Sequence, residues 1–136
     1  MTFEEFNSMV DLHDAQLQLL SHDYERGTVQ LVADIVVGLP DEPKPQCDRR
    51  RKGEIVFEGV QYCMIEPPCG ELLSSIPDCP WILSFEKSLP KNLPKQLANA
   101  VGSEAPCYSL FIHGWFAHIH IAATNIRFNW KVPDTK

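Results

Sequence analysis

Two histidines separated by one residue carry the most suggestive chemistry of this chain. His118 and His120 alternate with the apolar residues Ala117, Ile119 and Ile121. Side chains two residues apart on a β-strand leave the same face of the sheet, so both imidazoles would point to one side. That spacing lets two ring nitrogens converge on zinc or another divalent transition metal. The pair predicts either a metal site or two histidines on the wetter face of a strand.

A metal site needs a third ligand, and the sequence does not name one. His13, Asp14, His22 and Asp23 are candidates only if the first strand lies near the last. His13 and Asp14 could also form a general base with its orienting carboxylate, but neighbours on a strand point apart. We therefore expect this pair to hold a chain junction through backbone hydrogen bonds.

The absence of common catalytic motifs and the net charge limit the functions that the sequence supports. The chain has no G-x-S-x-G elbow, no phosphate-binding P-loop, no G-x-G-x-x-G and no H-E-x-x-H sequence. This favours a noncatalytic binding domain without a cofactor over an enzyme. The net charge of -6 argues against nucleic acid and anionic membranes as partners, and suits a basic protein partner.

Length and hydropathy predict one domain over residues 1–136. No stretch approaches the roughly 18 uninterrupted apolar residues that span a bilayer. The first residues, MTFEEFNSMVDLHD, lack the basic start and apolar run of a signal peptide. We therefore expect a cytoplasmic protein.

The two histidines belong to the most legible stretch, residues 107–131. Apolar residues fall on odd positions at Ala117, Ile119 and Ile121, and on even positions at Ile126 and Phe128. Tyr108, Leu110 and Ile112 continue the same period of two upstream. Strict alternation is typical of half-buried strands, and the change of phase requires a turn or a bulge between them.

The rest of the chain supplies the elements around that stretch. A capping box at Thr2 and Glu5 predicts a helix of about two turns ending near Asp11. Alternation predicts a hairpin with strand residues Ala15–Leu19 and Val29–Val37, and a third strand over residues 53–65 with a bulge at Glu58–Gly59.

Residues 66–106 form an irregular, proline-rich excursion. Within it, Trp81, Leu83 and Phe85 predict a short strand, and helical spacing predicts a small helix over 94–101. The predicted fold class is therefore α+β: a mostly antiparallel sheet, curved or sandwich-like, with a short amino-terminal helix and one small later helix.

The order of these motifs is similar to the immunity-protein-50-like group of small bacterial domains. The shared features are LHDA at residues 12–15, a turn at Gly27, GEIVFEGV at residues 53–60 and the closing alternating stretch. The proline-rich excursion lies outside the resemblance.

The resemblance implies a domain that binds and neutralises a toxin without catalysis of its own. The positions that match the motif are His13, Asp14, Phe57 and Val60. The alternative is a small metal-binding protein or metal-dependent enzyme that uses His118 and His120. A third possibility is a structural or self-associating module whose exposed strand edge makes a dimer, so we expect a monomer or a homodimer.

Overall fold

The computed structural model describes residues 1–38, 41–44, 49–66, 81–87, 106–113 and 117–131. These residues form one helix and six strands. The elements are α1 Phe3–Met9, β1 Ala15–Asp23, β2 Thr28–Val36, β3 Arg50–Ile65, β4 Trp81–Lys87, β5 Cys107–His113 and β6 Ala117–Trp130.

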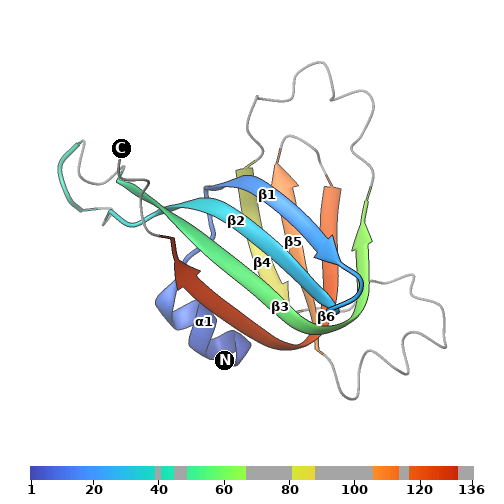
Figure 1. Cartoon of the computed structure of the whole chain (residues 1–136). Helices are drawn as coiled ribbons and strands as arrows, with labels where there is room; N and C mark the ends of the chain where they lie inside the picture. The colour runs from blue at the N-terminus through green and yellow to red at the C-terminus, as the bar shows by residue number, and fades with distance from the viewer. Residues whose placement is uncertain (39–40, 45–48, 67–80, 88–105, 114–116, 132–136) are drawn as a thin grey trace, which may run out of the picture.

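All neighbouring strands are antiparallel, and together they close into a barrel in the order β1-β2-β3-β6-β5-β4 (Figure 1). The long strands β3 and β6 lie side by side and form the curved wall of the barrel. The interior is filled by fully buried apolar side chains from every strand, among them Leu31, Phe57, Ile82, Ile112 and Ile121. The barrel therefore has a packed core.

The α+β prediction is wrong. The sheet is neither an open curved sheet nor a sandwich, because its first and fourth strands pair and close it. Closure depends on two residue pairs, Ala15 with Ile82 and Gln16 with Trp81. Because these pairs are few and join strands far apart in the chain, they leave no periodic pattern in the sequence. The second helix that we expected over 94–101 lies outside the described residues.

The change of apolar phase marks a corner in the two long strands. On β6 the inward row passes from Ala123 to Ile126, and on β3 it passes from Phe57 to Val60. Strand β6 runs through this point without a turn. Gly59 takes a φ of 63° there, and a Cβ at this position would collide with Thr124. The corner bends the wall inward, and glycine suits it because it alone adopts this φ without steric cost.

The expected bulge lies two residues further on. The pairing of β3 with β6 is regular at Glu58–Gly59 and shifts between Val60 and Tyr62. The shift turns Tyr62 and Met64 to the outer face, whereas unbroken alternation would keep them on the same face as Val60. An inserted residue has this effect because it reverses the faces of every later side chain.

Similar shifts explain two exposed leucines. The register changes between Leu17 and Leu19 on β1, and between Ile82 and Ser84 on β4. As a result Leu19 and Leu83, which we had placed with the apolar rows, are exposed. Ile82, which alternation had placed on the other face, is completely buried.

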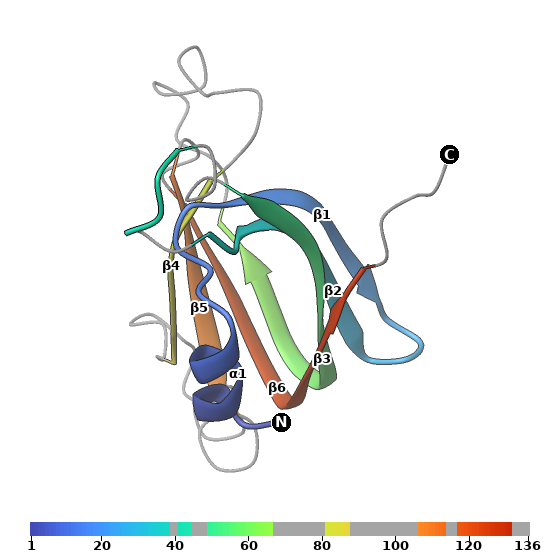
Figure 2. The same cartoon turned by 90° about the vertical axis from the view of Figure 1, so that its left-hand side faces the viewer.

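Helix α1 packs against the barrel near the corner of β6 (Figure 2). The predicted capping box is present: Thr2 and Glu5 exchange hydrogen bonds between side chain and backbone. Phe6 is fully buried and contacts the rings of Phe85 and Phe128 edge-on. The short helix is held by this tertiary packing, since seven residues are too few for an isolated helix in water.

Among the residues that the structure describes, no helix is both long and apolar enough to cross a membrane.

Candidate metal centre

The outer face of β6 carries the two histidines that the sequence singled out. Ile119 and Ile121 point inward and are fully buried. His118 and His120 alternate with them along the strand and therefore face outward. Their rings stack with centroids 5.3 Å apart and planes 15° from parallel. The alternation of β6 therefore places both imidazoles on one patch, as its sequence predicted.

Glu66 comes to this patch from the end of β3. Its backbone N–H donates to the carbonyl of His118 at 3.0 Å, which continues the β3–β6 ladder by one residue. In return the N–H of His118 donates to Oε1 of Glu66 at 2.6 Å. This backbone pairing fixes the carboxylate directly beside the first imidazole.

The three side chains bring their ligand atoms close to one another. One ligand atom from each of Glu66, His118 and His120 lies within 4.8 Å of the others. Glu66 Oε1 is 3.1 Å from Nδ1 of His118, and its Oε2 is 3.9 Å from Nε2 of His120. Two ligands of one tetrahedral zinc ion are about 3.3 Å apart, given bonds of about 2.0–2.1 Å. The two measured separations lie on either side of this value, and the nearly parallel rings would turn so that both imidazole nitrogens face one ion.

Ser109 orients the buried histidine. It stands opposite His120 on β5, and its Oγ lies 2.7 Å from Nδ1 of that imidazole. When Nε2 binds a metal, Nδ1 keeps its proton and donates to the serine oxygen. Metal-binding histidines usually make such a second hydrogen bond, because it fixes the tautomer and the direction of the ring.

The electrostatics of the cluster favour the protonation states that bind metals. Burial lowers the pKa of His120, and His118 adds to this effect, while the Glu66 carboxylate opposes it. The hydrogen bond from the backbone N–H of His118 lowers the pKa of Glu66, against a smaller effect of desolvation. A neutral imidazole and an ionised carboxylate are the forms required of ligands.

Access to the cluster is one-sided. The side chain of His120 is 8% exposed, whereas those of His118 and Glu66 are 44% and 39% exposed. The strands cover one side of the cluster and leave the other open to solvent. An ion held here would keep coordination positions for water or a small ligand, as in metal sites with three protein ligands.

The other histidine–carboxylate pair has a different character. His13 and Asp14 lie just before β1, with Nδ1 and Oδ2 3.3 Å apart and both side chains more than half exposed. Asp14 takes a φ of 64°, which is why the two side chains meet although neighbours on a strand would not. Its N–H donates to the carbonyl of Ile82 at 2.8 Å, so the predicted junction role fits the geometry.

Asp14 also lines a shallow pocket of about 310 Å³ together with Trp81, Ile82, Leu83 and His113. The described residues show no third ligand joining His13 and Asp14. His22 and Asp23, the remaining ligand candidates, lie at the end of β1, where His22 stacks on Tyr24. Of the described residues that could form a group of three ligands, only Glu66, His118 and His120 come together.

The remaining motif residues are part of the fold. Phe57 is fully buried in the barrel core, and Val60 packs against that core beside the corner. Phe57 therefore presents no surface to a partner, and Val60 is only partly exposed. The match to these two positions in the resemblance is therefore a match of core positions.

Glu66 is the site residue that sequence reasoning missed. A signal was present: both long strands change apolar phase, at Gly59 and Thr124. Aligning these two points in an antiparallel pair places Glu66 within one residue of His118. The single-residue register shift after Val60 supplies the rest.

Comparison with known proteins adds no family to this geometry: no protein-family model matches the chain, and no curated protein matches it.

Proposed function

We propose that this protein binds a divalent transition metal ion, with zinc first among the candidates, through Glu66, His118 and His120. The observation that supports the proposal is the convergence of three ligand atoms from two strands within 4.8 Å. The contact between Ser109 and His120 adds a preset orientation that two solvated histidines on a wet face would not need.

The donor set indicates the class of metal. Two imidazole nitrogens and one carboxylate oxygen suit zinc, and with open positions they also suit iron(II). Calcium and magnesium prefer all-oxygen sites. An ion at this site would polarise a bound ligand or lower the pKa of a bound water, while Glu66 and the imidazoles hold it in place.

Zinc titration of the metal-free protein by calorimetry tests the proposal. We expect one zinc ion per chain, and a loss of affinity in Glu66→Gln, which keeps the shape of the side chain and removes its charge. Asp14→Asn is the matched control, since it makes the same change beside a histidine for which the described residues supply no third ligand. Equal zinc affinity in wild type and Glu66→Gln would contradict the assignment of Glu66.

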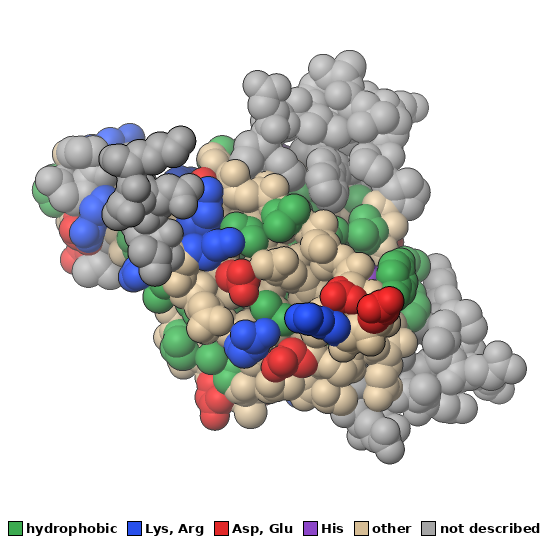
Figure 3. All heavy atoms as spheres, in the orientation of Figure 1, with side chains coloured by type: hydrophobic (Ala, Val, Ile, Leu, Met, Phe, Trp, Pro, Cys, Tyr) green, Lys and Arg blue, Asp and Glu red, His purple; other side chains and the backbone are tan. Residues whose placement is uncertain are grey.

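A noncatalytic, toxin-neutralising function stays a prediction. Its support is the net charge of -6, which suits a basic partner, and the resemblance over residues 12–65 and 107–131. On the face seen in Figure 3, acidic and basic side chains interleave. Across β3 and β6, Glu54 lies 3.8 Å from Lys131, and Glu58 lies 3.7 Å from Arg127. These acidic side chains are thus paired with basic ones, which weakens the case for an acidic docking surface on β3 and β6, so we favour metal binding.

A further inference from the structure

The patch around the candidate metal centre contains a thioether donor, Met64, that the proposed function does not use. Three strands place three rows of side chains on the outside of the barrel. The rows are Glu66–His118–Phe111, Met64–His120–Ser109 and Tyr62–Ala122–Cys107. Met64 therefore stands beside the buried histidine of the site, on the side opposite Ser109.

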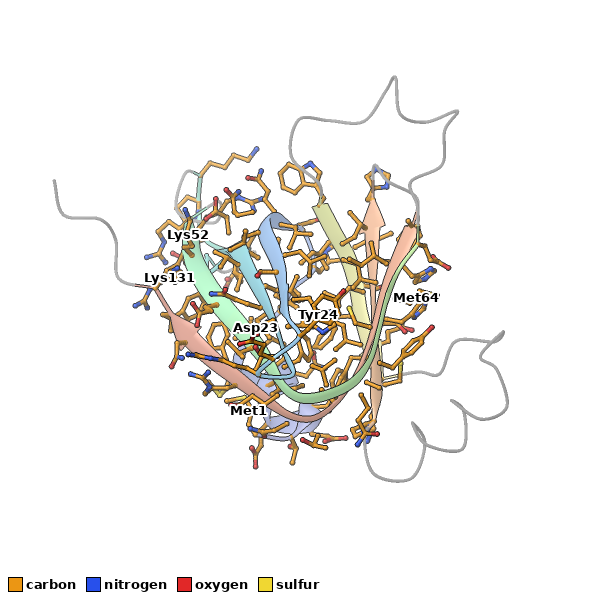
Figure 4. The ribbon with its side chains drawn as sticks, turned by 45° about the vertical axis from the view of Figure 1, so that its right-hand side comes forward. Met1, Asp23, Tyr24, Lys52, Met64 and Lys131 are labelled. Carbon is orange, nitrogen blue, oxygen red and sulfur yellow. The ribbon has the colours of Figure 1, made fainter. Side chains whose placement is uncertain are left out.

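Cross-strand pairing brings the Met64 thioether close to the site. Met64 is the direct partner of His120 in the β3–β6 ladder, and directly opposed residues have Cβ atoms about 4.5–5.5 Å apart. It also lies two residues before Glu66, on the same face of β3. Figure 4 shows Met64 at the far end of the long strands from Lys52 and Lys131.

A hydrogen bond keeps the sulfur on this face. The hydroxyl of Tyr62 donates to Sδ of Met64 at 3.2 Å. Met64 is half-buried, so its side chain rests on the sheet. A thioether has two lone pairs, and accepting one weak hydrogen bond leaves the other for a metal. Methionine is also flexible enough to turn its sulfur by small rotations.

We propose that the site also binds copper(I), with Sδ of Met64 joining His118 and His120 in place of the Glu66 carboxylate. Thioether sulfur is a soft ligand that selects copper(I), imidazole binds copper well, and carboxylate oxygen suits harder ions. The same two histidines would thus bind zinc with Glu66 and copper(I) with Met64, two donors that lie two residues apart at the β3 side of the site.

Among the described cysteines, neither is as well placed as Met64 to supply the soft donor. The thiol of Cys107 lies in the third row, two residues from Ser109, and burial raises its pKa to about 11. Cys63 packs against the barrel core, on the opposite face of β3 from Met64. A thiol binds copper as the thiolate, whereas a thioether needs no deprotonation.

The inference rests on the proposed function, because it uses the same two histidines. The test is a pair of competition titrations on wild type and Met64→Leu, one with zinc and one with copper(I) under nitrogen, each against a chromogenic chelator. Leucine conserves the volume of methionine, so the fold should tolerate the change. Met9→Leu is the matched control, because Met9 is exposed at the end of α1 and belongs to neither of the strands that carry the site.

We expect Met64→Leu to lower copper(I) affinity by about tenfold or more and to keep zinc affinity within about threefold of the wild type. The variant would then have lost affinity for copper(I) alone. Met9→Leu should change neither affinity. Equal copper(I) affinity in wild type and Met64→Leu would overturn this inference and leave the zinc site standing. Absence of zinc binding in the wild type would instead overturn the proposed function.

Discussion

Within the described residues, a histidine meets a carboxylate in two places, and the two differ in how they are built. Glu66 and His118 are 3.1 Å apart and are separated by 52 positions in the chain. His13 and Asp14 are 3.3 Å apart and are neighbours. The first pair is joined by His120 and oriented by Ser109, whereas the second is more than half exposed and gains no third ligand among the described residues.

The difference shows what strand pairing contributes to a site. For Glu66 and His118, the register of β3 against β6 sets the separation of the ligand atoms before any ion binds. For His13 and Asp14, the positive φ of Asp14 brings two solvated side chains together. A preset arrangement lowers the entropy that binding must overcome, so it favours tight binding. We therefore expect metal-dependent effects at the Glu66–His118 pair and none at the His13–Asp14 pair.

The largest effect should come from removing both strand histidines. An excess of zinc at about 100 times Kd should stabilise the wild type by about 2.7 kcal/mol, because the ion binds only the folded chain. The variant His118→Ala, His120→Ala should lose this stabilisation in a urea unfolding experiment. The variant His13→Ala, His22→Ala should keep it; if it also loses the stabilisation, the contrast between the two places fails.

A smaller loss should follow from removing the hydroxyl behind His120. Ser109→Ala leaves the ligands in place and removes the group that holds Nδ1. Zinc affinity should fall roughly 10- to 100-fold, the usual cost of losing such a partner. Ser21→Ala, an exposed serine on β1, serves as the control in the same titration. Unchanged affinity in Ser109→Ala would mean that the serine plays no part in orienting the ring.

The corner that carries β3 to the site can be tested through its glycine. Gly27 and Gly59 both have a positive φ, but a Cβ at Gly27 meets nothing closer than 4.0 Å, whereas at Gly59 it meets Thr124. Gly27→Ala should lower the free energy of unfolding by about 1 kcal/mol for the φ alone. Gly59→Ala should cost more, as measured by urea unfolding. Equal losses would show that the corner tolerates a side chain.

The smallest effect concerns pH in the metal-free protein. Burial lowers the pKa of His120 in the folded state, so the unfolded chain binds this proton more readily. The free energy of unfolding should therefore fall as the pH drops below about 6.5. The pKa of Glu66 is also lowered, so stability should fall further through the carboxylate range. His120→Gln should show a smaller fall between about pH 7.5 and pH 5.5 than the wild type.

Local patterns in the sequence predicted a large part of the fold. The capping box of α1, the β1–β2 hairpin and the alternation of β5 and β6 were readable because each depends on neighbouring residues. Closure of the barrel was not, because Ala15 meets Ile82 through contacts that no local pattern encodes. The register shifts at Gln18 and Leu83 were missed for a related reason: one inserted residue reverses a face without changing composition.

The same limit applied to the site. Alternation was enough to place His118 and His120 on one face, since that requires only their own strand. Glu66 arrives from another strand, beyond a corner and a register shift, so its place depended on pairing that the sequence did not specify. Strict alternation would place Met64 on the same face as Val60, whereas the register shift places it beside His120. Ligands from a single strand were predictable, and ligands between strands were not.

The most direct test of the account is the metal content of the purified protein after zinc loading and desalting, measured by mass spectrometry. The account predicts about one zinc ion per chain in the wild type and in His13→Ala, His22→Ala, and an empty His118→Ala, His120→Ala protein, in keeping with one three-ligand site. Equal zinc content in the wild type and in the variant without His118 and His120 would contradict it.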